Sequence, residues 1–122
     1  MSSRIPTPPA SAADKRKAFL ALHASGCFVI PNPWNLGSAR YLQGLGFKAL
    51  ATTSAGYAHS RGLPDGAVPL DEVLSHCREL AAATDIPLNA DFENGFADDP
   101  DGVAANVARC IETGVAGLSI ED

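Results

Sequence analysis

Carboxylate side chains gather at the ends of two short, largely apolar runs in the second half of the chain. Asp91 and Glu93 close the first run, residues 88–93, and Glu121 closes the second, residues 117–121. The length and composition of both runs predict β-strands, in which alternate side chains share a face. Asp91 and Glu93 would then point to one face of a sheet, and Glu121 would join them from the neighbouring strand.

Three carboxylates that converge in this way repel one another unless a proton or a cation offsets their charge. Hard divalent cations prefer oxygen ligands, and Mg²⁺ keeps several waters beside a small number of protein carboxylates. The pattern therefore predicts a site for Mg²⁺, with Mn²⁺ as a substitute, at Asp91, Glu93 and Glu121. For an acidic pair taken alone, a solvated strand end is the alternative interpretation.

The elements that must position these residues alternate between strands and helices. Apolar residues at helical spacing and capping residues predict helices, whereas short buried runs predict strands. The expected helices cover residues 11–25, 35–45, 70–84 and 99–113, with Ser11, Asn35 and Asp99 as the caps of the first, second and fourth. The expected strands cover residues 27–30, 48–53, 87–91 and 117–121. A long polar loop, residues 54–69, is expected to follow the second strand.

This order predicts an α/β protein with a parallel sheet. Polar residues at the carboxyl ends of the strands favour the N-terminal half of a (β/α)8 TIM-type barrel, truncated after strand four and spanning residues 11–122. A small open four-stranded sheet is the alternative. Residues 1–10 contain three prolines and are expected to form a disordered tail. The first strand-to-helix turn, residues 31–35, lacks the glycines of a dinucleotide-binding fold.

Composition narrows the class of function. A net charge of −5 provides no electrostatic footprint for nucleic acid or for an acidic membrane surface. No apolar run is long enough to cross a bilayer and no secretory signal is recognisable, so a cytoplasmic location is expected. The odd set Cys27, Cys77 and Cys110 predicts buried free thiols rather than disulfides. His76 is expected to be exposed on its helix.

Five short segments stand in a distinctive order along the chain. Their sequences are PNPWN at residues 31–35, GFKALATTS at 46–54, GLPDG at 62–66, DFENGF at 91–96 and GVAGLSIED at 114–122. In this order and spacing they resemble the isocitrate lyase / phosphoenolpyruvate mutase superfamily. The phrase TTSA at residues 52–55 favours the mutase-like and oxaloacetate-decarboxylase-like branch over true isocitrate lyases.

The resemblance implies a β/α-barrel enzyme of the lyase or mutase type that requires Mg²⁺. Such an enzyme would act on a 2-oxo acid or a related carboxylate, and would break or make a C–C or P–C bond through a metal-stabilised enolate. In such proteins a residue at the position of Asp91 contacts the metal. Carboxylates at the positions of Glu93 and Glu121 hold the metal, often through water.

Further residues match the substrate-binding parts of that superfamily. Thr53, Ser54 and Ala55 match a loop that grips the substrate carboxylate or phosphonate, and Asp65 matches a catalytic acidic residue on a mobile loop that closes over the site. Trp34 lies at the same end of the sheet, where it would either pack or contact substrate. Plainer roles stay open, because Thr53 and Ser54 suit strand ends and turns, and Asp65 lies in a Pro-Asp-Gly turn signature.

Members of the superfamily are considerably longer than this chain, which suggests a fragment with weak or no activity. Open sheet edges pair with other chains, so a homo-oligomer is expected. The expected partner is a small 2-oxo acid, with no nucleic acid and no membrane. Two other classes of function stay open: a catalytically inactive barrel fragment that self-associates as a scaffold, and a flavodoxin-like phosphate-binding domain that uses the turn at residues 52–54.

Overall fold

The computed structural model describes residues 10–122, so the tail expected at residues 1–10 lies outside the described residues apart from Ala10. The described part folds into helices and strands that alternate from β1 onward except for the extra helix α3. Their bounds are α1 (Ala12–Leu22), α2 (Leu36–Gly44), β1 (Leu50–Ala51), α3 (Ser54–Ser60), α4 (Leu70–Ala83), β2 (Leu88–Asp91), α5 (Pro100–Ile111) and β3 (Gly117–Ser119).

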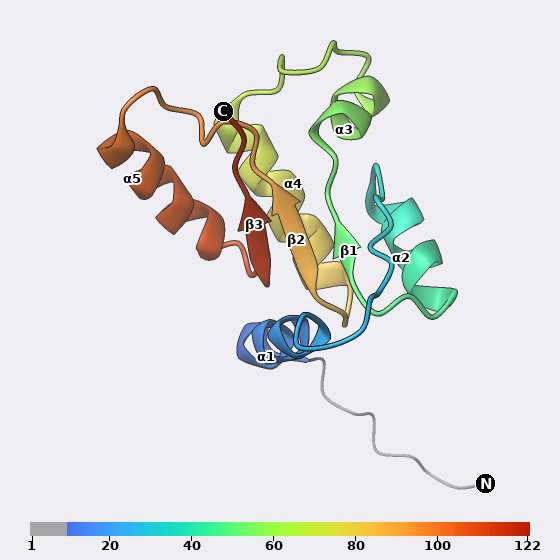
Figure 1. Ribbon diagram of the computed structural model, residues 1–122. Coiled ribbons are helices and arrows are strands. Elements are labelled where there is room, and N and C mark those ends of the chain that lie inside the picture. The colour runs from blue at the N-terminus through green and yellow to red at the C-terminus, as the bar shows by residue number, and fades with distance from the viewer. Residues whose placement is uncertain (1–9) are drawn as a thin grey trace, which may run out of the picture.

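The strands form one parallel sheet in the order β1-β2-β3. Figure 1 shows α4 behind this sheet, with α2 and α5 on either side of it, and α1 below the amino ends of the strands. The opposite face of the sheet is covered by no helix within residues 10–122. The expected α/β class with a parallel sheet is confirmed, and all carboxyl ends of the strands lie at one edge.

Side chains of β2 alternate between the helices and the open face of the sheet. Leu88 and Ala90 are buried, as is Phe92 just beyond the strand, whereas Asn89 and Asp91 are half-buried. Full burial of a Leu or Phe side chain contributes about 1.5–3 kcal/mol, so a slip of one residue would be costly. The alternation expected from the sequence is therefore confirmed, and it directs Asp91 to the open face.

The prediction of a strand at residues 27–30 is wrong. This segment has no assigned strand, and Val29 is 66% exposed. The contact with β1 comes just after it, where the Ala51 N–H donates to the carbonyl of Pro31 at 3.1 Å and the Asn32 amide donates to the carbonyl of Ala51 at 3.1 Å. A longer ladder would need N–H donors, which Pro31 and Pro33 lack. The described sheet thus has three strands instead of four.

The polar loop expected at residues 54–69 begins with a helix, α3. Thr53 caps this helix, because its Oγ1 accepts a hydrogen bond from the Gly56 N–H at 3.2 Å. The caps expected elsewhere are confirmed at Ser11, Asn35 and Asp99. No helix within residues 10–122 is long and apolar enough to span a membrane.

The cysteines differ from the expectation at one position. Cys77 and Cys110 are buried and free, whereas Cys27 is exposed on the segment that fails to form a strand. The two buried thiols belong to the core between α4, α5 and the sheet. The remaining large, fully buried side chains of this core include Leu50, Leu80, Leu88 and Phe92.

Lys15 joins α1 to the C-terminal end of α4. Its ammonium group donates to the carbonyls of Ala81 and Thr84 at 2.7 and 2.6 Å, and the residue is 7% exposed. Carbonyls at the end of a helix lack intrahelical donors, and a cation there also complements the helix dipole. Burial lowers the pKa of Lys15, while the charge of Asp85 opposes this shift.

Replacing Lys15 with Met should lower the free energy of unfolding by about 2 kcal/mol, because hydrogen bonds from a charged donor contribute about 1.5–3 kcal/mol. Urea unfolding followed by circular dichroism measures the change. Lys17→Met is the control, since Lys17 is exposed on the same helix, and it should change stability by less than about 0.5 kcal/mol. Equal losses in the two variants would contradict the assigned role of Lys15.

Candidate functional site

Asp91 lies at the centre of the edge where the strands end. Its Oδ2 accepts hydrogen bonds from the backbone N–H of Ser54 at 2.9 Å and from Ser54 Oγ at 2.7 Å. Its own N–H donates to Oγ1 of the buried Thr52 at 2.8 Å. The residues that follow β1 therefore hold both the backbone and the carboxylate of Asp91, which orients this carboxylate before any ligand binds.

Glu93 reaches the site through a turn instead of through strand alternation. The strand β2 ends at Asp91, and Glu93 adopts a left-handed backbone conformation with φ of 52°. Such a conformation is uncommon for residues other than glycine, and it is often retained at functional sites. The N–H of Glu121 donates to the carbonyl of Glu93 at 2.6 Å, so this turn is tied to the chain that follows β3.

Asn106 of α5 holds the same turn from the side of the helices. Its side-chain amide donates to the carbonyls of Gly95 and Phe96 at 2.9 and 3.2 Å. Gly95 has a φ of 82°, and a Cβ there would lie 2.8 Å from a methyl group of Val103. Sequence reasoning overlooked Asn106, although a polar residue inside the apolar stripe of a helix is a usable signal for such a role.

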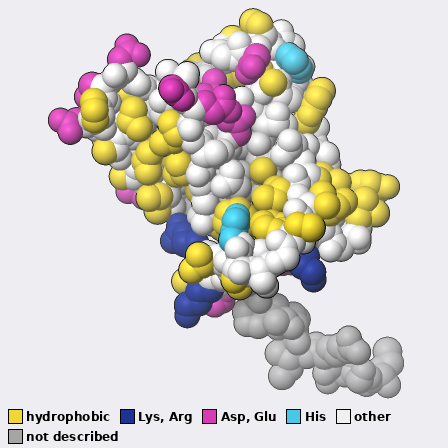
Figure 2. All heavy atoms as spheres, in the orientation of Figure 1, with side chains coloured by type: hydrophobic (Ala, Val, Ile, Leu, Met, Phe, Trp, Pro, Cys, Tyr) yellow, Lys and Arg dark blue, Asp and Glu magenta, His cyan; other side chains and the backbone are white. Residues whose placement is uncertain are grey.

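Four acidic residues act on one another electrostatically at this edge. The pKa of Glu93 is raised, first by burial and then by the negative charges of Asp91, Asp65 and Glu121. Figure 2 shows acidic side chains together at the upper end of the open face. A pocket of about 420 Å³ at this place is lined by Ser54 and by the carboxylates of Asp65, Glu93 and Glu121, and none of its lining residues is Lys or Arg.

The donor set suits a hard cation, although the side chains are not arranged as a closed cage. Within residues 10–122, no group of three His, Cys, Asp or Glu side chains is close enough to hold an ion jointly. Mg²⁺ does not need such a cage, because it usually binds through one or two carboxylates and several waters. The carboxylate oxygens of Asp91, Glu93 and Glu121 are crowded together, and no Lys or Arg lines the pocket beside them. They therefore fit the Mg²⁺ ion that the sequence predicts.

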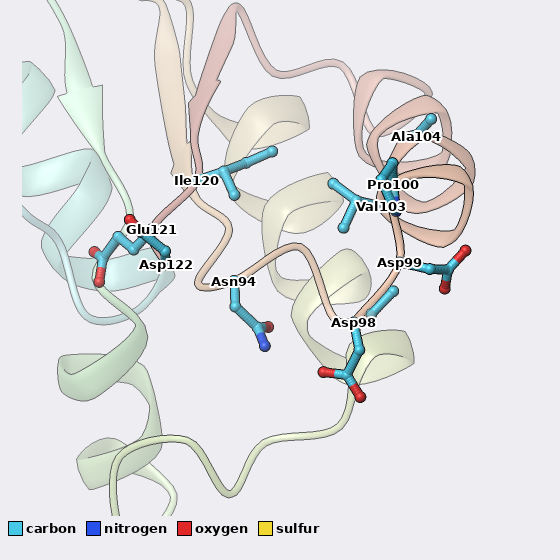
Figure 3. A pocket seen from close by; sticks show the side chains of 10 residues that line it. Asn94, Asp98, Asp99, Pro100, Val103, Ala104, Ile120, Glu121 and Asp122 are labelled. Atoms are coloured by element: carbon cyan, nitrogen blue, oxygen red, sulfur yellow. The ribbon is translucent and has the colours of Figure 1, made fainter.

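A second open pocket, of about 720 Å³, adjoins this cluster between the end of β3 and the start of α5. Figure 3 shows Ile120 and Val103 facing each other across it, while Glu121 turns away from both. Ile120 and Glu121 thus point in different directions, as the sequence predicts. Apolar side chains such as Ile120 and Val103 thus line this pocket, and Glu121 lines both this pocket and the 420 Å³ pocket of the candidate site.

The substrate-binding residues expected after the second strand form the first turn of α3. The N–H of Ser54 donates to Asp91 and that of Gly56 donates to Thr53 Oγ1, whereas the N–H of Ala55 has no acceptor within the described residues. Ser54 therefore orients Asp91 in this structure. Ala55 retains a free donor close to the pocket, as the first N–H groups of a helix commonly do.

Trp34 and Asp65 are placed differently with respect to the site. A Cβ on Gly56 would overlap Cδ1 and Nε1 of Trp34, so the indole packs directly on the first turn of α3 while remaining 48% exposed. Asp65 is exposed in the turn that ends with Gly66, at the mouth of the 420 Å³ pocket. The structure brings Asp65 to the site across a long separation in sequence, whereas Trp34 supports the site through packing.

His76 is buried, contrary to the expectation that it is exposed on its helix. It is 4% exposed, and its ring stacks on Tyr57 with a centroid distance of 3.8 Å. Burial lowers its pKa from 6.5 to about 4. The helical spacing of Val73, His76 and Leu80 places the three on one face of α4, so periodicity was the signal that could have identified this buried position.

Known proteins share both the sequence pattern and the fold. The family described as phosphoenolpyruvate phosphomutase matches residues 19–122. The structure of a putative lyase/mutase from Burkholderia cenocepacia J2315 is 52% identical, with a TM-score of 0.89 over 91% of this chain and 40% of that chain. The 2-methylisocitrate lyase of Halalkalibacterium halodurans is 37% identical over 98 residues, which cover 76% of this chain and 31% of that enzyme.

A further solved structure is informative because of its ligands. Phosphonopyruvate hydrolase, in complex with oxalate and Mg²⁺, is 25% identical, with a TM-score of 0.84 over 88% of this chain and 38% of that chain. The chain spans less than half the length of each of these relatives.

Replacing Gly56 with Ala should destabilise the protein by about 1–3 kcal/mol, the usual cost of overpacking, because the new methyl group must displace Trp34. The change should also shift the tryptophan fluorescence, since Trp34 is the sole tryptophan. Gly44→Ala is the matched control. A Cβ at Gly44 meets no atom within 4 Å, and the substitution should stabilise α2 by about 0.5–1 kcal/mol. Equal behaviour of the two variants would contradict the packing of Trp34 on α3.

Stability should fall as the pH decreases from about 6.5 to about 4. His76 has a lower pKa in the folded protein than in the unfolded chain, so the unfolded state takes up the proton first and the folded state loses up to about 3 kcal/mol. Urea unfolding at several pH values tests this. His76→Gln should flatten the profile in this window, whereas His23→Gln, at an exposed position, should leave it unchanged.

Proposed function

Because the chain belongs to the phosphoenolpyruvate phosphomutase family, within the isocitrate lyase / phosphoenolpyruvate mutase superfamily, we propose that it carries the metal-binding part of an active site for a 2-oxo acid or a related carboxylate. Proteins of this superfamily are lyases and mutases that act on carboxylates and phosphonates. The proposed reaction is the cleavage of a C–C or P–C bond next to the carbonyl of the substrate. The observation that carries the proposal is the crowding of the negative charges of Asp91 and Glu121 around Glu93, beside a pocket that no Lys or Arg lines.

The proposed cofactor is Mg²⁺, with Mn²⁺ as a substitute, held by Asp91, Glu93 and Glu121. When bound, this cation would act as a Lewis acid and a template for the oxygen atoms of the substrate. Asp91 is prepared for this role, because Ser54 fixes the orientation of its carboxylate. The structure of phosphonopyruvate hydrolase with oxalate and Mg²⁺ supports the pairing of this cation with a dicarboxylate in a related protein.

The substrate carboxylate would lie against the first turn of α3. The free N–H of Ala55 offers a hydrogen bond there, and Thr53 stabilises the turn by capping the helix. Trp34 would act through its packing on Gly56, which holds this turn in place. The exposed part of its indole would form one side of the substrate site. In this arrangement Ser54 serves the substrate indirectly, by orienting Asp91.

Asp65 would transfer protons at the mouth of the site. Its turn lies on the segment between α3 and α4, so it can approach the pocket without distorting the sheet. A positioned carboxylate can act as a general acid or base once it lies within hydrogen-bond reach of the reacting atom. Asp65 is exposed in the structure, so it would reach a reacting atom only when a substrate occupies the pocket.

A second proposal, in which the chain self-associates as an inactive scaffold, is supported by its exposed apolar side chains. Tyr41 and Leu45 of the α2 region are 68% and 60% exposed, and Val29 beside β1 is 66% exposed. The open face and edges of a sheet also favour pairing with another chain. This proposal predicts association that does not depend on metal, and no stabilisation by Mg²⁺ and oxalate. The thermal-shift experiment below therefore separates the scaffold from the enzyme.

Mg²⁺ and oxalate together should raise the melting temperature of the protein, whereas oxalate alone should not. A ligand that binds only the native state stabilises it by RT ln(1 + [L]/Kd), or about 2.7 kcal/mol at a hundredfold excess over Kd. Differential scanning fluorimetry measures the shift. Asp91→Asn should abolish the shift, because the substitution removes the charge of the central ligand while keeping its shape.

Glu112→Gln is the control for this experiment, since Glu112 is an exposed carboxylate at the end of α5. This variant should respond to Mg²⁺ and oxalate as the wild type does. A missing shift in the wild type, or an undiminished shift in Asp91→Asn, would reject the metal site.

A further inference from the structure

Among the buried side-chain nitrogen and oxygen atoms of residues 10–122, Nε2 of His76 is the one that has no hydrogen-bond partner. A buried acceptor without a partner loses its bonds to water on folding and gains none in exchange, which costs free energy. The ring cannot easily turn away to find a partner, because it stacks on Tyr57 at 3.8 Å with an interplanar angle of 22°. A fixed ring with an unpaired nitrogen indicates a ligand at that nitrogen.

His76 lines a small cavity directly behind the candidate metal site. The cavity has a volume of about 10 Å³, and its other lining residues with polar side chains are Thr52, Thr53, Ser54, Tyr57, Asp91 and Glu93. A space of this size accepts about one water molecule and excludes any larger ligand. An apolar cavity of the same size would stay dry, whereas the hydroxyl and carboxylate groups here favour hydration.

Thr52 supplies the second hydrogen bond that such a water needs. Its Oγ1 accepts the N–H of Asp91 at 2.8 Å, and its hydroxyl proton has no acceptor within the described residues. Neutral imidazole offers one acceptor nitrogen, and Nε2 of His76 is free to be that acceptor. One water could therefore accept a hydrogen bond from Thr52 and donate one to His76, which satisfies both groups.

We infer that this cavity is a hydration site in which one water molecule bridges Nε2 of His76 and Oγ1 of Thr52. The water continues the hydrogen-bond chain that ends at the backbone N–H of Asp91, and so links α4 to the carboxyl end of β2. His76 is then a positioning residue behind Asp91. The hydration site itself is independent of the proposed function, but the positioning role rests on the metal site proposed above.

Metal-free protein tests the hydration site directly. Water-to-protein rotating-frame Overhauser NMR should show contacts from a long-lived water to the His76 ring and the Thr52 side chain in the wild type. These contacts should vanish in His76→Phe, which keeps the stacked ring and removes the nitrogens. Their absence from the wild type would overturn the inference, even if the Phe variant failed to fold.

The stability of His76→Phe provides a second test, because a hydrated cavity and a dry cavity predict different changes in the free energy of unfolding. If water bonds to Nε2, His76→Phe should raise the unfolding equilibrium constant about fivefold at pH 7.5, through loss of about one net hydrogen bond. If the cavity is dry, the same substitution removes an uncompensated polar atom, so it should leave stability unchanged or increase it. His76→Gln, which retains a polar end group, should preserve most of the stability and the water contacts.

Calorimetric titration with Mn²⁺ on the same variants separates this inference from the proposed function. We expect His76→Phe to weaken Mn²⁺ binding about tenfold, as changes to residues behind metal ligands commonly do, and His76→Gln to bind nearly as the wild type does. Water contacts without any Mn²⁺ binding would reject the proposed function and keep the hydration site. Binding of Mn²⁺ that is unaffected by His76→Phe would reject the positioning role.

Discussion

Crowding of negative charge at one edge of the sheet is the constraint on which the rest of this structure depends. Burial and the charges of Asp91, Asp65 and Glu121 raise the pKa of Glu93, and no Lys or Arg lines the pocket that Asp65, Glu93 and Glu121 share. A fold that served stability alone would relieve this repulsion, since like charges without compensation destabilise one another. The carboxylates stay together because separate elements hold each of them.

Those elements act through short-range contacts. Ser54 and Thr52 hold Asp91 from the end of β1, and Asn106 holds the turn that presents Glu93. Trp34 in turn packs on the helix that begins at Ser54. A site supported from several directions keeps its geometry when no ligand is bound, which lowers the cost of ordering on binding.

The open face of the sheet explains how this site is reached. Helices α2, α4 and α5 cover one face, and the carboxylates lie at the end of the other. In the larger relatives, of which the chain spans less than half, β/α units have the same arrangement over the shared part. The fold therefore places the acidic edge where ligands of parallel α/β proteins commonly bind, at the carboxyl ends of the strands.

Local rules were sufficient to predict from sequence the α/β class, the helix caps at Ser11, Asn35 and Asp99, and the direction of Asp91, because capping and period-2 alternation depend on residues close in the chain. The segment at residues 27–30 was assigned incorrectly, since a strand needs a partner whose donors and acceptors match, and prolines follow it. The burial of His76 was overlooked, although its helical spacing with Val73 and Leu80 was a local signal for it. Only the tertiary structure decided that Glu93 arrives through a left-handed turn and that residues 54–60 form a helix. Both depend on contacts between segments far apart in sequence, which no local pattern encodes.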